Sequence, residues 1–277
     1  MAELVFLKLG GSLITNKEKP YTPRLDKLAE LASQIAAVLS TITGLQLLIG
    51  HGSGSFGHTE AKKYHTRMGL PPPDGKLTEG GDNYWQGFSE VHYQASKLNA
   101  LVMEALNQAR IPSMVFPPSA CVIARQRVVR SWDVAPIRRA LANRILPVIY
   151  GDVVFDEVHG GTILSTEDLL EYLAQRLNPL RILLAGLEAG VWEDFPARTK
   201  LIKEISPKSY ESIQTRIGQS ASADVTGGMA SKVRQMLALV RQSPQLTVQI
   251  FSGTENGALR RALAGEPLGT LICSESK

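Results

Sequence analysis

The sequence has few cysteines, no long apolar runs and no clusters of positive charge. Its 277 residues contain two cysteines, Cys121 and Cys273, and no Cys-x-x-Cys pair. This argues against a disulfide framework or a structural zinc site and favours a reducing compartment. No uninterrupted apolar stretch reaches the roughly 18 residues of a membrane-spanning helix. The first residues, MAELVFLKLGGSLI, are typical of a β-strand rather than a signal peptide. We therefore expect a soluble, cytoplasmic protein.

The positive charge of the chain is small and thinly spread. Thirty basic and 26 acidic residues give a formal net charge of +4, and no group of lysines and arginines is interleaved with aromatic residues. Nucleic acid and membranes are therefore not expected as partners. A mild surplus of positive charge suits a small anionic substrate.

Two kinds of apolar pattern alternate along the chain. Strand-like runs lie at 4–11, 45–50, 113–120, 144–152, 181–186 and 246–253. Apolar residues at every third or fourth position predict helices at 23–42, 83–109, 166–177 and 227–242. Segments 69–83 and 193–211 are expected to be irregular. Strands alternating with helices predict an α/β fold with a mostly parallel sheet covered on both faces. In such sheets ligands bind where turns leave the carboxyl ends of strands.

A glycine-rich turn, IGHGSGSFGH at 49–58, follows the second predicted strand. Gly52, Gly54 and Gly57 match the dinucleotide fingerprint G-x-G-x-x-G, but the acidic residue expected about 20 positions later on a second strand is missing. The turn also nearly matches the P-loop motif, but it has His58 at the position of the P-loop lysine. What remains is a group of backbone amide donors with His58 at its end, either as a phosphate ligand or as a histidine bonded to backbone.

Four other short segments have residue types that bind anions, although each also has an ordinary structural explanation. They are KLGGS at 8–12 with Lys17 beyond it, YGDVVFD at 150–156, STED at 165–168, and DVTGGMASK at 224–232. Lysines beside paired glycines suit phosphates, but surface lysines and tight turns have the same sequence. Asp168 either compensates a helix dipole or lies between two lysines. An anion at the helix start near Gly228 would be within reach of Lys232, although this start is equally compatible with simple capping. Together, two anion sites and several lysines favour phosphoryl transfer.

In this order and across almost the whole chain, these motifs resemble the amino acid kinase superfamily, and within it the isopentenyl phosphate kinases. The resemblance implies a three-layer αβα sandwich with an open, mostly parallel sheet, forming one domain over 1–277. Its lobe at about 1–165 would bind the acceptor, isopentenyl phosphate, and its lobe at about 166–277 would bind ATP. A homodimer is implied, together with Mg²⁺ held mainly by the ATP phosphates and no metal site of protein ligands.

The resemblance also implies a role for each matching residue. Lys8, Gly10, Gly11 and Ser12 would hold ATP phosphates, Lys17 would stabilise the transferring γ-phosphoryl group, and Gly186 would contact the nucleotide. Gly52, Ser53 and Gly54 would line the junction of the two substrates, and His58 would bind the acceptor phosphate, assisted by the Gly151 backbone. Asp168 would organise Lys8 and Lys232, while Gly228 and Lys232 would hold the β-phosphate side. The isoprenoid tail would lie against the helix that carries Tyr84, Phe88, Val91 and His92, where Gly87 would give room, although ordinary core packing explains each of these residues equally well.

The chain departs from the family pattern in one place. Where the family shows TDVDGVY beside the adenosine, this sequence has GLEAGVW at 186–192, so that Leu187 and Ala189 replace the usual aspartates and Glu188 is a candidate substitute. Three alternative functions stay open. They are a kinase of the same fold for another phosphate or phosphonate, such as fosfomycin, a non-catalytic ligand-binding regulator, and a nicotinamide-dependent oxidoreductase.

Overall fold

A computed structural model describes residues 3–70, 83–219 and 228–275, apart from the side chains of residues 216, 218 and 219. Residues 71–82 of the expected irregular segment, and 224–227 of the last motif, lie outside the described residues. The described part of the chain forms one large sheet of eight strands in the order β12-β14-β13-β9-β1-β2-β6-β3. All neighbours are parallel except β13 and β14. The strands are β1 (Glu3–Leu9), β2 (Leu45–His51), β3 (Ser113–Val115), β6 (Leu146–Tyr150), β9 (Arg181–Gly186), β12 (Glu204–Ile205), β13 (Thr247–Ser252) and β14 (Thr270–Ile272).

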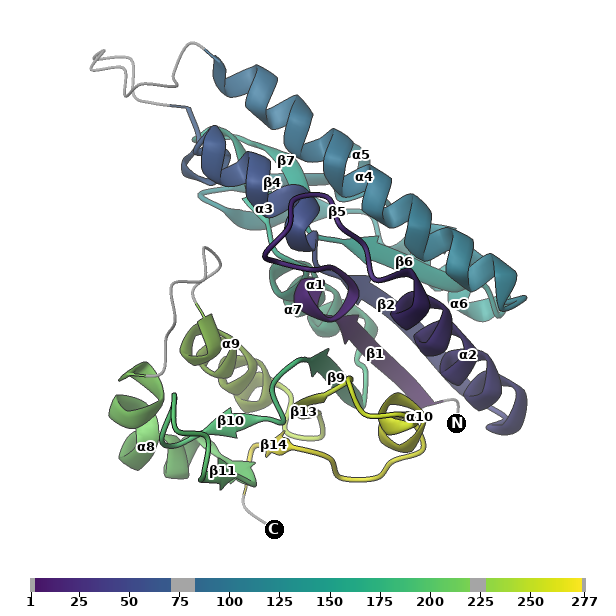
Figure 1. Ribbon diagram of the computed structural model, residues 1–277, viewed down its shortest axis with the longest axis vertical. Helices are drawn as coiled ribbons and strands as arrows, with labels where there is room; N and C mark the ends of the chain where they lie inside the picture. Colours follow the sequence, from purple (N-terminus) through teal and green to yellow (C-terminus); the bar gives the residue numbers. More distant parts are fainter. Residues whose placement is uncertain (1–2, 71–82, 220–227, 276–277) are drawn as a thin grey trace.

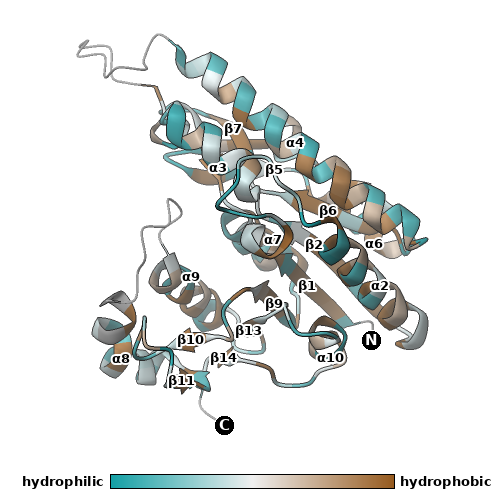
Figure 2. Ribbon diagram, in the orientation of Figure 1, coloured by the Kyte–Doolittle hydropathy of each residue, from teal (hydrophilic) through white to brown (hydrophobic). Residues whose placement is uncertain are grey.

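Helices cover both faces of this sheet, as Figure 1 shows. On β1 the side chains alternate, so that Phe6 packs into the core on one face and Val5 and Leu7 into the core on the other. The first core includes residues of α6 (Ala135–Ala142), α7 (Thr166–Leu177), α8 (Pro207–Gln219) and α9 (Gly228–Gln242). The second includes residues of α1 (Gly11–Ile14), α2 (Leu25–Thr41), α4 (Tyr84–Gln108) and α10 (Ala258–Leu263). In Figure 2, α2 and α4 show hydrophilic and hydrophobic residues in alternation along their length. This is the three-layer α/β fold that the sequence predicts.

A second, four-stranded sheet lies beside the upper part of the large one in Figure 1 and was not expected from the sequence. Its order is β5-β4-β7-β8, with β4 (Val122–Arg125), β5 (Val128–Trp132), β7 (Asp152–Asp156) and β8 (Gly160–Leu164). The predicted strand at 144–152 is therefore two strands, because the chain passes from one sheet to the other at Gly151. The predicted strand at 113–120 ends at Val115, and Pro117 precedes the short helix α5 (Pro118–Cys121), since proline has no amide to donate to a sheet.

The remaining short elements lie around the ends of these sheets. They are α3 (Gly54–Lys63), the 3₁₀ turn η1 (Thr66–Met68), β10 (Val191–Trp192) and β11 (Leu201–Ile202). The segment 193–211 was expected to be irregular, but it contains β11, β12 and the start of α8. No helix in the described part of the chain combines the length and the apolar character needed to cross a bilayer.

Candidate active site

The two glycine turns after β1 and β2 pack directly against each other. These strands are parallel neighbours, so both turns leave the same edge of the sheet. A Cβ atom at Gly11 would lie 2.6 Å from the backbone nitrogen of Gly54, and one at Gly52 would lie 3.0 Å from the nitrogen of Gly11. Side chains at these positions would force the turns apart. The glycines therefore bring two stretches of backbone together at one point.

Gly54 has a different place from the one expected, because it does not line the cavity that opens above the turns. It begins α3 with a φ of +51°, and a Cβ atom there would lie 2.2 Å from Thr15 Oγ1 and 2.8 Å from the Gly11 carbonyl oxygen. The Thr15 hydroxyl in turn donates to that carbonyl and accepts from the Ser55 amide. Gly54 therefore allows the turns to pack and is not in the wall of the site.

Replacing Gly54 with alanine tests this packing. Gly54→Ala should lower the free energy of unfolding by about 2–4 kcal/mol, because it adds overpacking to the strain of a left-handed backbone. Gly44→Ala is the matched control, since Gly44 has a φ of +87° with nothing within 4 Å of its Cβ position. It should cost only about 1 kcal/mol. Equal losses in urea unfolding of the two variants would contradict the close contact.

A cavity of about 660 Å³ runs across the turns from the N-terminal to the C-terminal half of the chain. It is lined by most of the residues singled out in the sequence: Lys8, Gly10, Gly11, Ser12, Lys17, Gly52, Ser53, His58, Val91, Gly151, Gly186, Gly228 and Lys232. Helices α7 and α9 begin at its wall, with their N-terminal residues Thr166 and Gly228 among those that line it. The first amides of a helix have no partner within the helix and carry partial positive charge, which favours anions.

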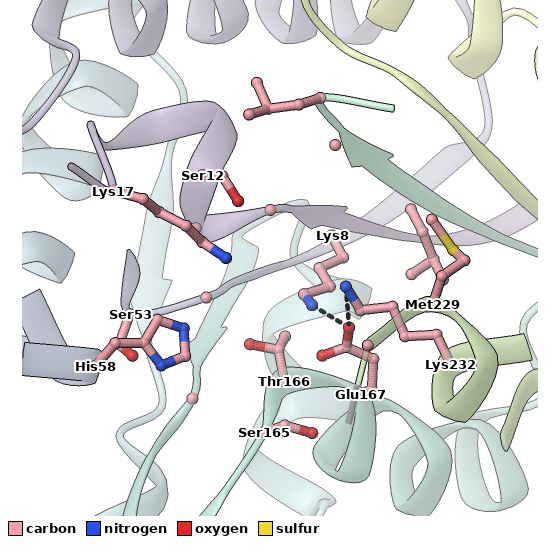
Figure 3. Close-up of a pocket in the computed structure, with 18 of the residues that line it drawn as sticks. Lys8, Ser12, Lys17, Ser53, His58, Ser165, Thr166, Glu167, Met229 and Lys232 are labelled. Carbon is pink, nitrogen blue, oxygen red and sulfur yellow. Dashed lines mark ion pairs between the residues drawn. The ribbon is translucent and has the colours of Figure 1, made fainter. Parts of the chain in front are cut away.

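His58 and Lys17 lie at one side of this cavity and the pair Lys8 and Lys232 at the other (Figure 3). His58 is half-buried in α3, while Lys17 is exposed on the segment that follows α1. Gly151 also lines the wall, but its amide donates to the His51 carbonyl at 3.1 Å. Gly151 therefore shapes the wall, and its amide already has a partner within the fold.

Glu167 joins Lys8 and Lys232 into an ion cluster, in which Glu167 and Lys8 are buried and Lys232 is half-buried. Its Oε1 atom pairs with Lys8 Nζ and lies 3.7 Å from Lys232 Nζ, as the dashed lines in Figure 3 show. Burial alone would raise the pKa of this carboxyl, but the two lysine charges outweigh it and lower the pKa to about 2. Glu167 is therefore ionised at neutral pH and holds both ammonium groups at the cavity wall.

The expectation that Asp168 lies between these lysines is wrong, because Glu167 occupies that position. Asp168 accepts from the amide and the hydroxyl of Ser165, at 2.8 and 2.7 Å, and its own amide donates back to Ser165 Oγ. This is a capping box at the start of α7, with Ser165 as the N-cap. Successive residues of a helix are about 100° apart around its axis. Because Asp168 points back to Ser165 at the cap, the neighbouring Glu167 points in another direction, toward Lys8 and Lys232. Asp168 therefore has a structural role at the helix start.

The expected tail pocket is only partly present. Val91 of α4 lines the cavity, together with Ala61 and Ile163, which the sequence did not single out. Phe88 was expected beside Val91 but does not line the cavity. Its ring packs 5.3 Å from the rings of both Trp85 and Phe155.

The other residues expected at that wall make contacts elsewhere. The Tyr84 hydroxyl donates to the Thr66 carbonyl, and His92 Nδ1 lies 3.0 Å from Asp152 Oδ2. Gly87 gives room to a protein side chain, because a Cβ atom there would lie 2.2 Å from Tyr64 Cβ. Ala61, Val91 and Ile163, which pack in one apolar cluster, therefore form an apolar end of the cavity on the side of α3, α4 and β8.

At the opposite end, the segment GLEAGVW at 186–192, which departs from the family pattern, takes part in a hydrogen-bond network around Glu188. Glu188 accepts from the Trp192 indole at 2.9 Å and from the Arg198 guanidinium at 2.8 Å, and all three residues line the cavity. Phe195 lies below Arg198, with the guanidinium 5.0 Å from the ring centre. Sequence reasoning missed Phe195 and Arg198, which lie in a segment that it treated as irregular. It also missed Arg67, which lines the cavity from η1.

The fold and the cavity together describe an α/β protein in which two glycine turns, two helix starts and several lysines line one cavity, a combination that suits phosphate groups. The chain belongs to the amino acid kinase family, whose model matches residues 3–252. It is similar to the isopentenyl phosphate kinase of Methanocaldococcus jannaschii, with 33% identity over 97% of this chain and 98% of that protein. It is also similar to the isopentenyl phosphate kinase of Haloferax volcanii, with 33% identity over 98% of this chain and 99% of the other. An X-ray structure of isopentenyl phosphate kinase superposes with a TM-score of 0.81 at 29% identity, covering 98% of this chain and all of the other.

Proposed function

We propose that this chain transfers the γ-phosphoryl group of ATP to the phosphate of isopentenyl phosphate, giving isopentenyl diphosphate and ADP. The observation that carries the proposal is one continuous cavity with three chemically distinct parts. Cationic side chains and helix starts lie in its middle, an apolar group of Ala61, Val91 and Ile163 lies at one end, and aromatic Trp192 and Phe195 lie at the other. A short prenyl tail fits the first end and a nucleoside the second.

The two substrates would meet at the glycine turns. An oxygen of the acceptor phosphate attacks the γ-phosphorus, and the bond from that phosphorus to the β,γ-bridging oxygen breaks as ADP leaves. A phosphate dianion needs no general base to act as nucleophile, so catalysis comes from position and charge. Lys17 would neutralise the transferring group, while Lys8 and Lys232 would neutralise the departing ADP. Glu167 fixes the last two lysines in place.

The residues of the cavity fit a magnesium ion that binds together with ATP. The carboxylate nearest the lysines, Glu167, is already engaged by two ammonium groups. We therefore infer that Mg²⁺ takes its ligands mainly from the ATP phosphates and water, as it commonly does. When bound, the ion neutralises charge on the β- and γ-phosphoryl oxygens.

The division of labour between the lobes is part of the same proposal. Residues from about 1–165 contribute His58, Lys17 and the apolar end, and residues from about 166–277 contribute Lys232 and the aromatic end. By resemblance to the family, we also propose that the protein is cytoplasmic and forms a homodimer. Light scattering on the purified protein tests the dimer.

An ADP-release assay with purified protein tests the activity. Isopentenyl phosphate should support turnover that depends on ATP and Mg²⁺, and it should do so far better than fosfomycin or short alkyl phosphates. A preference for fosfomycin would indicate the alternative kinase. No ADP release with any phosphorylated acceptor, despite ATP binding, would favour a non-catalytic regulator.

Truncating His58 should weaken acceptor binding. His58→Ala should raise the KM for isopentenyl phosphate about 10- to 150-fold, the equivalent of the roughly 1.5–3 kcal/mol in a charge-assisted hydrogen bond. The KM for ATP should change less than threefold. His65→Asn is the matched control, because His65 is exposed, does not line the cavity and has a φ of +50° that asparagine tolerates. An unchanged acceptor KM in His58→Ala would show that the acceptor phosphate binds elsewhere.

A further inference from the structure

The turn η1, Thr66–Met68, is held more firmly than a connecting turn requires. Each of its three carbonyl oxygens accepts a hydrogen bond from the side chain of a different segment: Tyr84 to Thr66 (3.2 Å), Thr162 to Arg67 (3.3 Å) and Arg127 to Met68 (2.7 Å). The donors come from α4, from β8 and from the turn between β4 and β5. Three independent elements therefore fix the backbone of this turn.

The residues on either side of η1 fix its ends. His65 precedes it with a φ of +50°, and Gly69 follows it with a φ of +86°. A Cβ atom at Gly69 would lie 2.6 Å from the Cβ atom of His159, and the Leu70 amide donates to the His159 carbonyl at 2.9 Å. The turn is thus pinned against the connection between β7 and β8.

Arg67 is the residue of this turn that lines the cavity. Thr66 is fully buried, and Met68 is 64% exposed. Arg67 lines the main cavity and also a small recess of about 40 Å³, which it shares with Ser165, Glu167 and Lys232. Its side chain therefore extends from the N-terminal half of the chain to the helix starts of the C-terminal half.

The substrates bring more negative charge to the cavity than Lys8 and Lys232 can neutralise, so a further cation such as Arg67 would help to bind them. A phosphate monoester carries a charge of about −1.5 to −2 at pH 7, and a Mg²⁺-bound nucleotide adds further negative charge. Glu167 cancels part of the charge that Lys8 and Lys232 bring. Arg24, Arg67 and Arg198 all line the cavity, and the guanidinium of an arginine can bind two phosphate oxygens at once. Of these three, Arg67 is the one that also lines the recess beside Glu167 and Lys232.

We propose that Arg67 binds the phosphate group of the acceptor together with His58, an inference that rests on the proposed function. The anchored turn sets the position of the guanidinium, and the planar fork orients the phosphate toward the γ-phosphoryl group. Arg67 is then a specificity residue for acceptors with a terminal phosphate. It contributes less to the binding of ATP.

Steady-state kinetics of two variants test the assignment. Arg67→Gln should raise the KM for isopentenyl phosphate about 10- to 100-fold, and the KM for ATP less than threefold. Arg67→Lys keeps the charge but loses the fork, so it should restore part of the acceptor affinity. Arg130→Gln is the control for the loss of one arginine, since Arg130 is exposed on β5 and does not line the cavity. Calorimetric titration with isopentenyl phosphate, without ATP, should show the same loss of affinity, and thermal melting should show that the variants are folded.

The outcomes separate this proposal from the proposed function. An unchanged acceptor KM in Arg67→Gln, with a raised KM in His58→Ala, would overturn the role of Arg67 and leave the kinase assignment intact. A selective rise in the KM for ATP would also overturn it, because Arg67 would then act on the nucleotide. If the wild-type protein releases no ADP with isopentenyl phosphate, the proposed function itself fails.

Discussion

Lys17→Met should lower kcat about 100- to 1,000-fold, the range found when one preorganised donor to a transition state is removed. Lys17 is exposed and lines the cavity on the side of His58, away from Lys8 and Lys232. We expect its charge to act chiefly on the transferring group, so the KM values of both substrates should change only a few-fold. Single-turnover measurements should show the same loss, because they report the chemical step without product release.

Lys19→Met is the matched control for this prediction. Lys19 is also exposed, only two residues further along, but it does not line the cavity. Its removal should leave kcat within twofold, and neither variant should change the free energy of unfolding by more than about 0.5 kcal/mol. A kcat for Lys17→Met within threefold of wild type would remove Lys17 from the chemical step.

Glu167→Gln should lower the free energy of unfolding by about 3 kcal/mol at pH 7. The folded-state pKa of about 2 lies below the ordinary value of 4.5, and each unit of difference is worth about 1.4 kcal/mol. The substitution leaves Lys8, only 8% exposed, beside a neutral amide, and removing one partner of a buried pair is costly.

The stabilisation by the Glu167 carboxylate should decrease as the pH falls. Because the folded-state pKa is lowered, the stabilisation by Glu167 is complete above about pH 4.5 and is lost as the pH falls toward 2. Urea unfolding should therefore show a large difference between wild type and Glu167→Gln at pH 7 and a smaller one at pH 3. Glu157→Gln, which removes an exposed carboxylate 3.6 Å from Arg125, should cost less than about 0.5 kcal/mol. A difference for Glu167→Gln that does not change between pH 7 and pH 3 would contradict the ion cluster.

The main strands and helices could be predicted because their apolar patterns are regular. The predicted helix at 166–177 matches α7, and the predicted strand at 181–186 matches β9. The second sheet could not be predicted in the same way. Its hairpin between β4 and β5 turns at Gln126 and Arg127, with φ values of +52° and +64°, where the favoured residues are asparagine and glycine. The turn signal was therefore missing from the sequence.

The parts of the site that depend on backbone shape, such as the glycine turns, could be predicted from the sequence. The parts that depend on the direction of a side chain were harder to predict. Paired glycines at the ends of parallel strands located the cavity, because few other residues allow such close contact. The choice between Glu167 and Asp168 depends on which side of the helix faces the lysines. The pattern Ser165-x-x-Asp168 is a capping signal in the sequence, and it would have assigned Asp168 to the cap and left Glu167 for the lysines.

The aromatic residues show a second limit. Phe88 and Val91 are three residues apart on α4, so helical spacing places them on the same face. Only their neighbours distinguish them, since Trp85 and Phe155 engage the ring of Phe88 while Val91 reaches the cavity. Such contacts between distant segments are not encoded in local spacing.

A crystal structure with isopentenyl phosphate and a non-hydrolysable ATP analogue shows where both sets of phosphates bind. We expect the acceptor phosphate to lie within hydrogen-bonding distance of His58, above the meeting point of the two glycine turns. One of its oxygens should point at the γ-phosphorus, with Lys17 beside the group to be transferred. An acceptor phosphate bound away from residues 52–58, or an analogue whose phosphates avoid Lys8 and Lys232, would contradict this expectation.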